Sequence, residues 1–349
     1  MKATRTNSMG IVIRLAALAV LIGAGWFGWV FVSEAYLSVP AGELVSVEIT
    51  STDLQTVSSE LQSKHLIASA FRFRTYHSLF NRDTSLKPGT YALRPGTAYR
   101  DLVRALALGP ARREVQLTII EGWTVDEIAA LLDQQEKINV KTTAELVGRS
   151  VDKQPFASRL RNDFPFLQNL PPNRSLEGYL FPDTYRVWAD QLPDSLILKQ
   201  LQEFSDKFGK ALPGPASEPL KTLDDVVTLA SIVEGEVRNP DDMKIVAGIF
   251  LNRMRIGMRL QTDASINYYT GSGRSRSTSS DLQLDTPYNS YKYAGLPPSP
   301  VGNPGSNAIQ AVLDPAKTDY FYFLTDAQGR VYYAKTLDEH AENRQKAGF

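Results

Sequence analysis

The first strong feature of the hydrophobic pattern is an uninterrupted apolar segment near the amino terminus. Residues 15–32 (LAALAVLIGAGWFGWVFV) carry no charge, and a helix of this length extends about 27 Å, roughly the thickness of a bilayer core. Lys2, Arg5 and Arg14 precede it without an acidic residue, which by the positive-inside rule predicts a cytoplasmic amino terminus. We therefore expect a cytoplasmic segment at 1–14, a transmembrane helix at 15–32 and an extracytoplasmic remainder.

Two other interpretations of this segment are less consistent with its sequence. A cleaved signal peptide needs an apolar core of about 7–15 residues and a site of small residues, whereas this segment ends in the bulky run WFGWVFV. A buried helix of a soluble domain normally has a polar face, and none is present here. An uncleaved membrane anchor is the prediction.

Beyond the anchor, the alternation of polar and apolar positions predicts short strands and helices. The expected elements are a connector at 33–44, a strand at 45–49, a helix capped by Asp53 and running to about Lys64, a turn and strand at 86–95, and an amphipathic helix at 99–108. Residues 115–120 alternate again, and an offset of 71 residues places Ile49 on Ile120 and Asp53 on Thr124, which opens a further helix with a capping box. A repeated strand-helix unit and plain α+β packing both explain this partial match, and packing is the simpler explanation.

The middle of the chain changes character. Residues 140–173 are predicted to be helical and rich in loops. Residues 176–185 (LEGYLFPDTY) then mix aromatic rings with glycine, proline and two carboxylates. Such mixtures often line clefts that bind sugars, so this segment is a weak indication of a glycan site.

The most informative segment is a predicted helix over 226–237, opened by a capping box that starts at Thr222. On a helical wheel, Glu234 falls within about 40° of Val227 and Ala230 on the apolar face, whereas Glu236 falls on the other side. A carboxyl group on an apolar face loses hydration, which raises its pKa toward the range of a proton donor at neutral pH. Glu234 is therefore a candidate general acid, and Glu236 is expected to be an ordinary solvated carboxylate.

The alternative for Glu234 is a structural ion pair with a buried arginine, such as Arg253 or Arg259. Asn239 is predicted to cap the following helix, which runs from Pro240 to about Ile256. Asn252 lies on its apolar side and is either a structural bridge or a site residue. The loop at 271–280 (GSGRSRSTSS) is basic and either flanks an anionic polymer or is a solvated linker.

Composition removes several classes of chemistry. The 349 residues suggest about two domains, and their equal counts of 38 basic and 38 acidic side chains give no net field for nonspecific nucleic-acid binding. No cysteine is present, and the three histidines, His65, His77 and His340, are not at ligand spacing. Thiol nucleophiles, histidine metal sites and Ser-His-Asp triads are thereby disfavoured, and acid-base catalysis falls to carboxyl groups.

The motifs, taken together and in order, resemble the YceG-like family of endolytic murein transglycosylases. The resemblance runs from about residue 45 to the end, with a proline of the family replaced by Ile120 and a variable loop at 271–280. It rests on IIEGWTVDEIA at 119–129, LEGYLFPDTYRV at 176–187, ASIVEGE at 230–236, NRMRIGMRLQTD at 252–263, TPYNSY at 286–291, GLPPSPVGNPG at 295–305 and YYAKTLDEH at 332–340.

This resemblance implies an α+β protein with three parts. These are the anchor, a LysM-like glycan-binding module at 45–115 and a mixed α+β catalytic domain at 116–349. It further implies a protein of the inner membrane whose catalytic domain is periplasmic, which cleaves the MurNAc–GlcNAc β-1,4 bond of nascent glycan strands and so terminates their elongation. The catalytic glutamate of the family maps onto Glu234. Peptidoglycan synthases are possible partners.

A lytic transglycosylase needs a single acid-base carboxyl group, because the 6-hydroxyl of MurNAc attacks the anomeric carbon and leaves a 1,6-anhydro end. No metal or organic cofactor is expected. Six polar side chains are candidate sugar-binding residues, each with a purely structural role as the alternative: Glu177, Asn252, Gln261, Asp263, Tyr288 and Asn289.

Two other functions remain open from the sequence. One is a glycan hydrolase that pairs Glu234 with a second acid such as Glu177 or Asp263. The other is a membrane-anchored scaffold without catalytic activity, which binds peptidoglycan and organises the wall-synthesis machinery.

Overall fold

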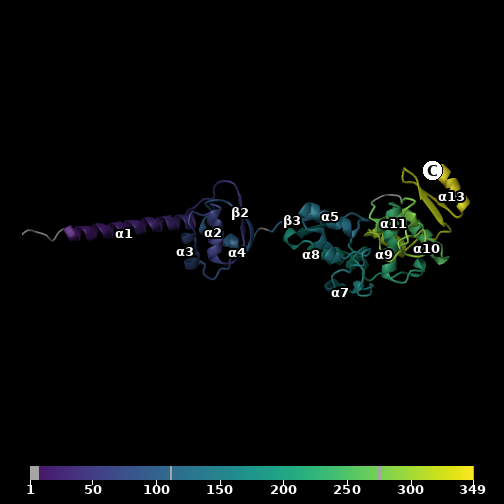
Figure 1. Ribbon diagram of the computed structural model, residues 1–349, viewed down its shortest axis with the longest axis horizontal. Coiled ribbons are helices and arrows are strands. Elements are labelled where there is room, and N and C mark those ends of the chain that lie inside the picture. Colours follow the sequence, from purple (N-terminus) through teal and green to yellow (C-terminus); the bar gives the residue numbers. More distant parts are fainter. Residues whose placement is uncertain (1–7, 111, 273–276, 349) are drawn as a thin grey trace, which may run out of the picture. The chain divides into compact units, whose positions relative to one another are not determined.

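The computed structural model describes residues 8–110, 112–272 and 277–348. The chain divides into two compact units, Met1–Arg112 (unit 1) and Arg113–Phe349 (unit 2), shown in Figure 1. Each combines helices with two-stranded antiparallel sheets. The predicted mixed α+β class is therefore confirmed.

Unit 1 begins with the long helix α1 (Ser8–Val32). Residues Val12–Leu37 are long and apolar enough to cross a membrane, and they are largely exposed in the structure, which is compatible with a single-pass anchor. The helix continues as a π-helical turn at Ser33–Leu37, so the prediction of a connector from residue 33 was wrong for its first part. The extension is held by Glu34, whose carboxylate pairs with Arg72. Lys2 and Arg5, used to orient the anchor, lie outside the described residues.

The rest of unit 1 forms a small α+β body with a core of its own. Its elements are β1 (Val45–Ile49), α2 (Leu54–Ser63), α3 (Ala70–Phe80), β2 (Gly89–Leu93) and α4 (Tyr99–Leu108). The strands pair antiparallel, with Val45 opposite Leu93. Asp53 caps α2 as predicted by accepting from the backbone N–H of Thr56 at 2.9 Å. The sequence analysis did not identify α3.

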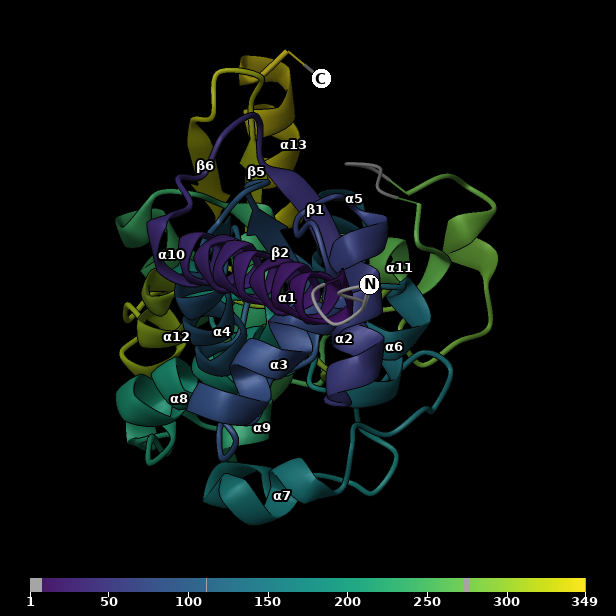
Figure 2. The same cartoon turned by 90° about the vertical axis from the view of Figure 1, so that its left-hand side faces the viewer.

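Unit 2 holds the remaining elements. They are β3 (Glu114–Thr118), α5 (Val125–Glu136), α6 (Val140–Val147), α7 (Arg159–Asp163), β4 (Thr184–Trp188), α8 (Asp194–Phe208), α9 (Leu223–Glu236), α10 (Pro240–Arg255), α11 (Asp263–Thr270), α12 (Ser306–Leu313), β5 (Tyr322–Thr325), β6 (Val331–Ala334) and α13 (Leu337–Lys346). Short 3₁₀ turns lie at Pro165–Leu167, Ala189–Gln191, Pro215–Ser217 and Asp281–Gln283. In Figure 2, α13 lies beside β5 and β6 at one end of this unit.

The β3–β4 sheet brings distant segments together. Glu114 lies opposite Trp188, and just past the sheet the Ile119 N–H donates to the Asp183 carbonyl at 2.9 Å. Thr124 caps α5 with the predicted capping box. The strand itself begins earlier than the 71-residue offset requires and pairs with a strand from much later in the chain. Helices α2 and α5 nevertheless begin 71 residues apart, at Leu54 and Val125, so the predicted repeat of one strand and one helix is present.

Helix α9 lies at the centre of unit 2 and contacts α10, α11 and α12 (Figure 1). It begins at the predicted capping box of Thr222, and all residues from Val226 to Val233 are buried. A helix that is buried all round belongs to a core rather than to a surface. Asn239 caps α10 as predicted, by accepting from the N–H groups of Asp241 and Asp242. The contacts of α9 with α10, α11 and α12 hold this helix in place, and its last turn carries Glu234.

Candidate active site

Glu234 lies at the end of a buried helix but is itself only half-buried. Its Oε2 accepts a hydrogen bond of 2.9 Å from the backbone N–H of Gly305. Burial raises the pKa of Glu234 above the usual 4.5, the Gly305 N–H opposes this rise, and the negative charge of Glu121 adds to it. A carboxyl group with a raised pKa that still reaches solvent is suited to donate a proton.

The alternative of a structural ion pair does not hold for Glu234. The Arg253 guanidinium donates instead to the backbone carbonyls of Phe321, at 2.6 Å, and Leu260. Arg259 is exposed, and among the described residues no cation lies within ion-pair distance of the Glu234 carboxylate. Its proton is therefore not displaced by a neighbouring positive charge.

Two loops approach Glu234 closely through their glycines. The Gly122 N–H donates to the Asn303 carbonyl and the Asn303 N–H to the Trp123 carbonyl, both at 2.8 Å, so the loops are paired. Gly122 has a φ of +82°, and a Cβ on it would lie 3.5 Å from Cγ of Glu234. A Cβ on Gly305 would overlap Oε1 of Glu121. A side chain at position 305 would therefore collide with the Glu121 carboxyl group, whereas at position 122 the positive φ favours glycine.

The fully buried side chain of Asn303 makes hydrogen bonds to several segments around these two loops. Its side-chain oxygen accepts from the N–H groups of Gly178 and Leu180, each at 2.9 Å. Its amide nitrogen donates to the Trp123 carbonyl at 2.8 Å and to Glu177 Oε1 at 3.2 Å. One side chain therefore joins three segments that are far apart in the sequence.

Glu177 is buried beneath these loops at 1% exposure. It accepts from the Val125 N–H at 3.1 Å and from Asn303, and it faces the Tyr268 hydroxyl. Burial raises the pKa of Glu177 to about 8, with the Val125 and Tyr268 hydrogen bonds opposing the rise and the charges of two nearby acids adding to it. Glu177 is thus protonated at neutral pH.

We expect Glu177→Gln to flatten the dependence of stability on pH. Between pH 4.5, the usual glutamate pKa, and about 8, the native state binds a proton at Glu177 that the unfolded state has released. The free energy of unfolding therefore falls as pH rises through this window, by at most about 1.4 kcal/mol per pH unit. Gln mimics the neutral form and removes this contribution. Urea unfolding at several values between pH 5 and pH 9 measures it, and parallel curves for the two proteins would contradict the assignment.

A cavity of about 640 Å³ opens beside the last turn of α9. It is lined by the first turn of α5, residues 149–152, α11 and the α9 residues Ser231, Gly235 and Glu236. Gly122, which lies against Glu234, also lines it. The cavity is of the size that ligand pockets commonly have, and Gly122 and Gly235, two neighbours of Glu234, line it.

Glu236 is not the solvated carboxylate that the helical wheel predicts. It accepts a hydrogen bond from the Thr262 hydroxyl, and burial raises its pKa, with the hydrogen bond and Arg253 opposing the rise and Asp263 adding to it. The helical-wheel prediction failed because Thr262, in the segment before α11, lies against the Glu236 side chain, which is only partly exposed and lines the cavity.

Asp263 and Gln261 lie at the start of α11, next to the cavity. Asp263 lines it, and its Oδ1 accepts from the Tyr291 hydroxyl at 3.1 Å. Gln261 is exposed with a φ of +54°, a conformation that costs a non-glycine residue energy and is enriched at functional sites. Their contact with sugar stays a prediction.

Tyr288 and Asn289 are buried behind α11. The Tyr288 hydroxyl pairs with Ser299 Oγ at 2.7 Å, and its ring stacks on that of Tyr269 with centroids 5.8 Å apart. Asn289 is fully buried and donates to the carbonyls of Leu282 and Leu284. Both side chains have protein partners and support the α11 wall of the cavity.

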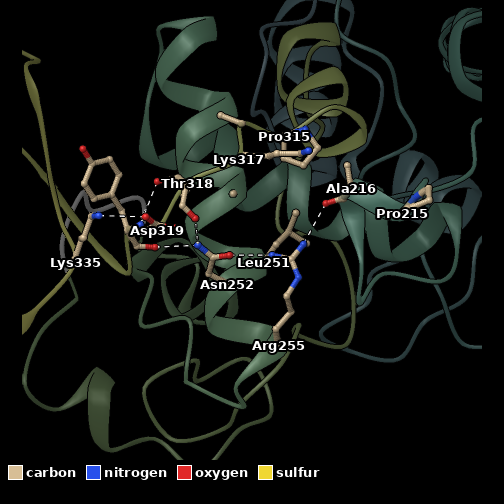
Figure 3. Close-up of a pocket in the computed structure, with 13 residues that line it drawn as sticks. Pro215, Ala216, Leu251, Asn252, Arg255, Pro315, Lys317, Thr318, Asp319 and Lys335 are labelled. Carbon is tan, nitrogen blue, oxygen red and sulfur yellow. Dashed lines mark hydrogen bonds and ion pairs between the residues drawn. The ribbon is translucent and has the colours of Figure 1, made fainter.

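Asn252 lies in a different pocket, of about 550 Å³ (Figure 3). Its amide nitrogen donates to the carbonyls of Thr318, at 2.8 Å, and Tyr320, at 3.2 Å, and its oxygen accepts from Arg255. Of the two predicted roles, the structure supports the bridge: Asn252 ties α10 to the segment before β5.

The aromatic segment at 176–185 does not line a cleft. Tyr179, Phe181 and Tyr185 are all buried in the unit 2 core, and the Tyr179 hydroxyl donates to Asp224 at 2.8 Å. The prediction of a sugar-binding segment was wrong here, because composition does not reveal which way the rings point. Of the basic loop, residues 273–276 lie outside the described residues.

Four residues that the structure brings to this site were not predicted from the sequence. Glu121, Tyr268, Tyr269 and Asn303 lie at or beside the cavity. Glu121 and Asn303 belong to the motifs IIEGWT and GNPG, so their neighbourhood was noted without a role. Tyr269 is 37% exposed and presents the kind of ring face on which a sugar can pack. Within the described residues, no cluster of His, Asp and Glu could hold a metal ion.

Comparison with known proteins yields one consistent family. The model of the YceG-like family matches residues 47–346. Proteins named endolytic murein transglycosylase are 33% identical in Streptococcus pneumoniae serotype 2, over 94% of this chain and 63% of the relative, and 30% identical in Bacillus subtilis strain 168, over 89% and 84%. The chain thus spans less than two thirds of the pneumococcal relative. The crystal structure of a yceG-like protein from Listeria monocytogenes is 31% identical with a TM-score of 0.53, over 87% of this chain and 100% of that one.

Proposed function

The chain belongs to the YceG-like family, and on this basis we propose that it is a peptidoglycan lytic transglycosylase with Glu234 as its acid-base residue. It cleaves the MurNAc–GlcNAc β-1,4 bond within nascent glycan strands, leaves 1,6-anhydroMurNAc ends and thereby terminates strand elongation. The observation that carries the proposal is the position of Glu234: a half-buried carboxyl group with a raised pKa, next to Gly122, which lines the cavity.

The reaction needs one group that first gives and then takes a proton. Protonated Glu234 donates to the glycosidic oxygen as the bond to the anomeric carbon breaks. The resulting carboxylate accepts the proton of the MurNAc 6-hydroxyl, whose oxygen forms the new bond to that carbon. The Gly305 N–H, 2.9 Å from Oε2, stabilises the carboxylate between the two steps. No water is consumed, so a second carboxylate that activates water is not required.

The side chains first considered as a second acid are poorly suited to that role. Glu177 is buried and protonated at neutral pH, so it is neither a base nor a nucleophile there. Asp263 carries a hydrogen bond from Tyr291 at the start of α11. The exposed ring of Tyr269 and the polar groups of α11 and α5 supply the surface on which a glycan strand is held.

Unit 1 supports an arrangement in which the enzyme works at the membrane. We assign α1 as the anchor of a protein of the inner membrane, with the amino terminus cytoplasmic and unit 2 in the periplasm. The order β1, α2, α3, β2 of unit 1, with its antiparallel pair, is the strand-helix-helix-strand arrangement expected of a LysM-like glycan-binding module. Glycan strands are the partner, and peptidoglycan synthases are the proteins that such an enzyme would meet.

Product analysis tests the proposed reaction. We expect the full chain, incubated in detergent with un-crosslinked glycan strands, to release fragments with 1,6-anhydroMurNAc ends, identified by mass spectrometry. Fragments internal to long strands are expected, since the cleavage is endolytic. Reducing MurNAc ends, each heavier by one water, would show hydrolysis and refute the transglycosylase assignment.

A further inference from the structure

Glu121 is a second carboxyl group beside Glu234, and the mechanism above does not use it. It belongs to the loop between β3 and α5, and its side chain is exposed. Its Oε1 occupies the space that a side chain at position 305 would need, next to the backbone N–H that donates to Glu234. The next residue, Gly122, lies against Cγ of Glu234. Both neighbours of Glu234 are therefore also neighbours of Glu121.

The position of Glu121 is fixed by the fold. Gly122 and Trp123 are paired through their backbones with Asn303, and a Cβ on Gly302 would lie 2.5 Å from the Gly122 carbonyl oxygen. The tight packing of these two loops holds the Glu121 backbone in place. The negative charge of Glu121 is therefore carried by a backbone segment whose position relative to Glu234 is fixed.

The other charged groups near the end of α9 are engaged elsewhere. The Glu236 carboxylate is held by Thr262, and Asp263 accepts from Tyr291. Gly305, the residue before α12, offers Glu234 only an uncharged backbone N–H, and among the described residues Glu234 has no cationic partner. Glu121 is the charge that acts on Glu234 most directly.

We propose that Glu121 is a positioning residue of the active site, which places a negative charge beside Glu234 and acts on the reaction through it. This inference rests on the proposed function for its catalytic consequence. A like charge disfavours ionisation, so it keeps Glu234 in the proton-donating form to a higher pH.

The variant Glu121→Gln tests this proposal by a shift in the pH profile. Without the negative charge, Glu234 releases its proton at lower pH, so the alkaline limb of kcat against pH moves to lower pH by about half to one unit. Above that limb, kcat falls by about three- to tenfold while KM changes little. Glu145→Gln is the matched control, because Glu145 is an exposed glutamate on α6 whose loss changes the net charge equally. An unshifted limb in Glu121→Gln, or the same shift in Glu145→Gln, would overturn the proposal.

A second measurement separates this proposal from the proposed function. Carboxyl ¹³C NMR of the full chain in detergent follows the titration of Glu234 without turnover, with Glu234→Gln identifying its signal. We expect the Glu234 titration to move to lower pH in Glu121→Gln and to stay in place in Glu145→Gln. A wild-type protein that makes no anhydro ends but shows this shift would refute the function and retain the inference. A wild-type protein that makes anhydro ends, with no shift of the Glu234 titration in Glu121→Gln, would retain the proposed function and refute the inference.

Discussion

Replacing Glu234 by Gln is expected to lower the rate of glycan cleavage by at least a hundredfold and to leave the fold intact. Gln has the shape of a protonated glutamate and still offers the Gly305 N–H an oxygen, so the end of α9 keeps its contact. It has no proton to give to the glycosidic oxygen and cannot take one from the 6-hydroxyl. One acid-base group contributes about 10²–10⁴-fold to a rate. The release of anhydro ends by the purified full chain measures the loss, with circular dichroism as the test of folding.

The control for this experiment is again Glu145→Gln, which removes an exposed glutamate that does not line the cavity and should keep full activity. A Glu234→Gln protein with more than a tenth of the wild-type rate would show that another group is the acid. In cells, the same variant distinguishes enzyme from scaffold. A scaffold without catalytic activity predicts that Glu234→Gln complements a deletion as well as the wild type does, whereas an enzyme predicts failure at equal protein level.

The parts of the fold that the sequence predicted well are those set by local interactions. Asp53, Thr124, Thr222 and Asn239 each cap a helix with a hydrogen bond that spans two or three residues, so the sequence alone specifies it. The transmembrane candidate is equally local, since it depends on length and composition. The raised pKa of Glu234 could be predicted because the position of this residue on the apolar face is fixed by the period of a single helix.

The parts that failed depend on which segments meet in the folded chain. The wheel placed Glu236 in solvent, but Thr262, a distant residue in the sequence, covers it. Asn252 was correctly expected to need partners, yet no pattern could indicate that they are carbonyls near residue 320. Glu121 was overlooked because an exposed loop glutamate carries no signal until Gly305 is brought against it. The surroundings of Glu236, Asn252 and Glu121 are thus all set by residues that are distant in the sequence.

The site should therefore be most sensitive at the residue that makes most of these pairs, Asn303. We expect Asn303→Ala to lower the free energy of unfolding of unit 2 by about 3 kcal/mol or more. The change leaves the N–H groups of Gly178 and Leu180 without a partner, and each buried unsatisfied group costs about 1–3 kcal/mol. It also removes one of the hydrogen bonds to the buried carboxyl group of Glu177. Urea unfolding of the full chain, followed by tryptophan fluorescence, measures the loss.

The same substitution should also reduce activity under conditions where the variant remains folded. Asn303 pairs with the loop that carries Glu121 and Gly122, and it precedes the Gly305 amide that binds Glu234 by two residues. Loosening these loops removes the fixed surroundings of the acid, so kcat falls while Glu234 itself is unchanged. Asn307→Ala, on the exposed side of α12, is the matched control and should change neither stability nor rate. If the two variants unfold at the same urea concentration, Asn303 does not hold the site together, and the buried hydrogen bonds are replaced by water at little cost.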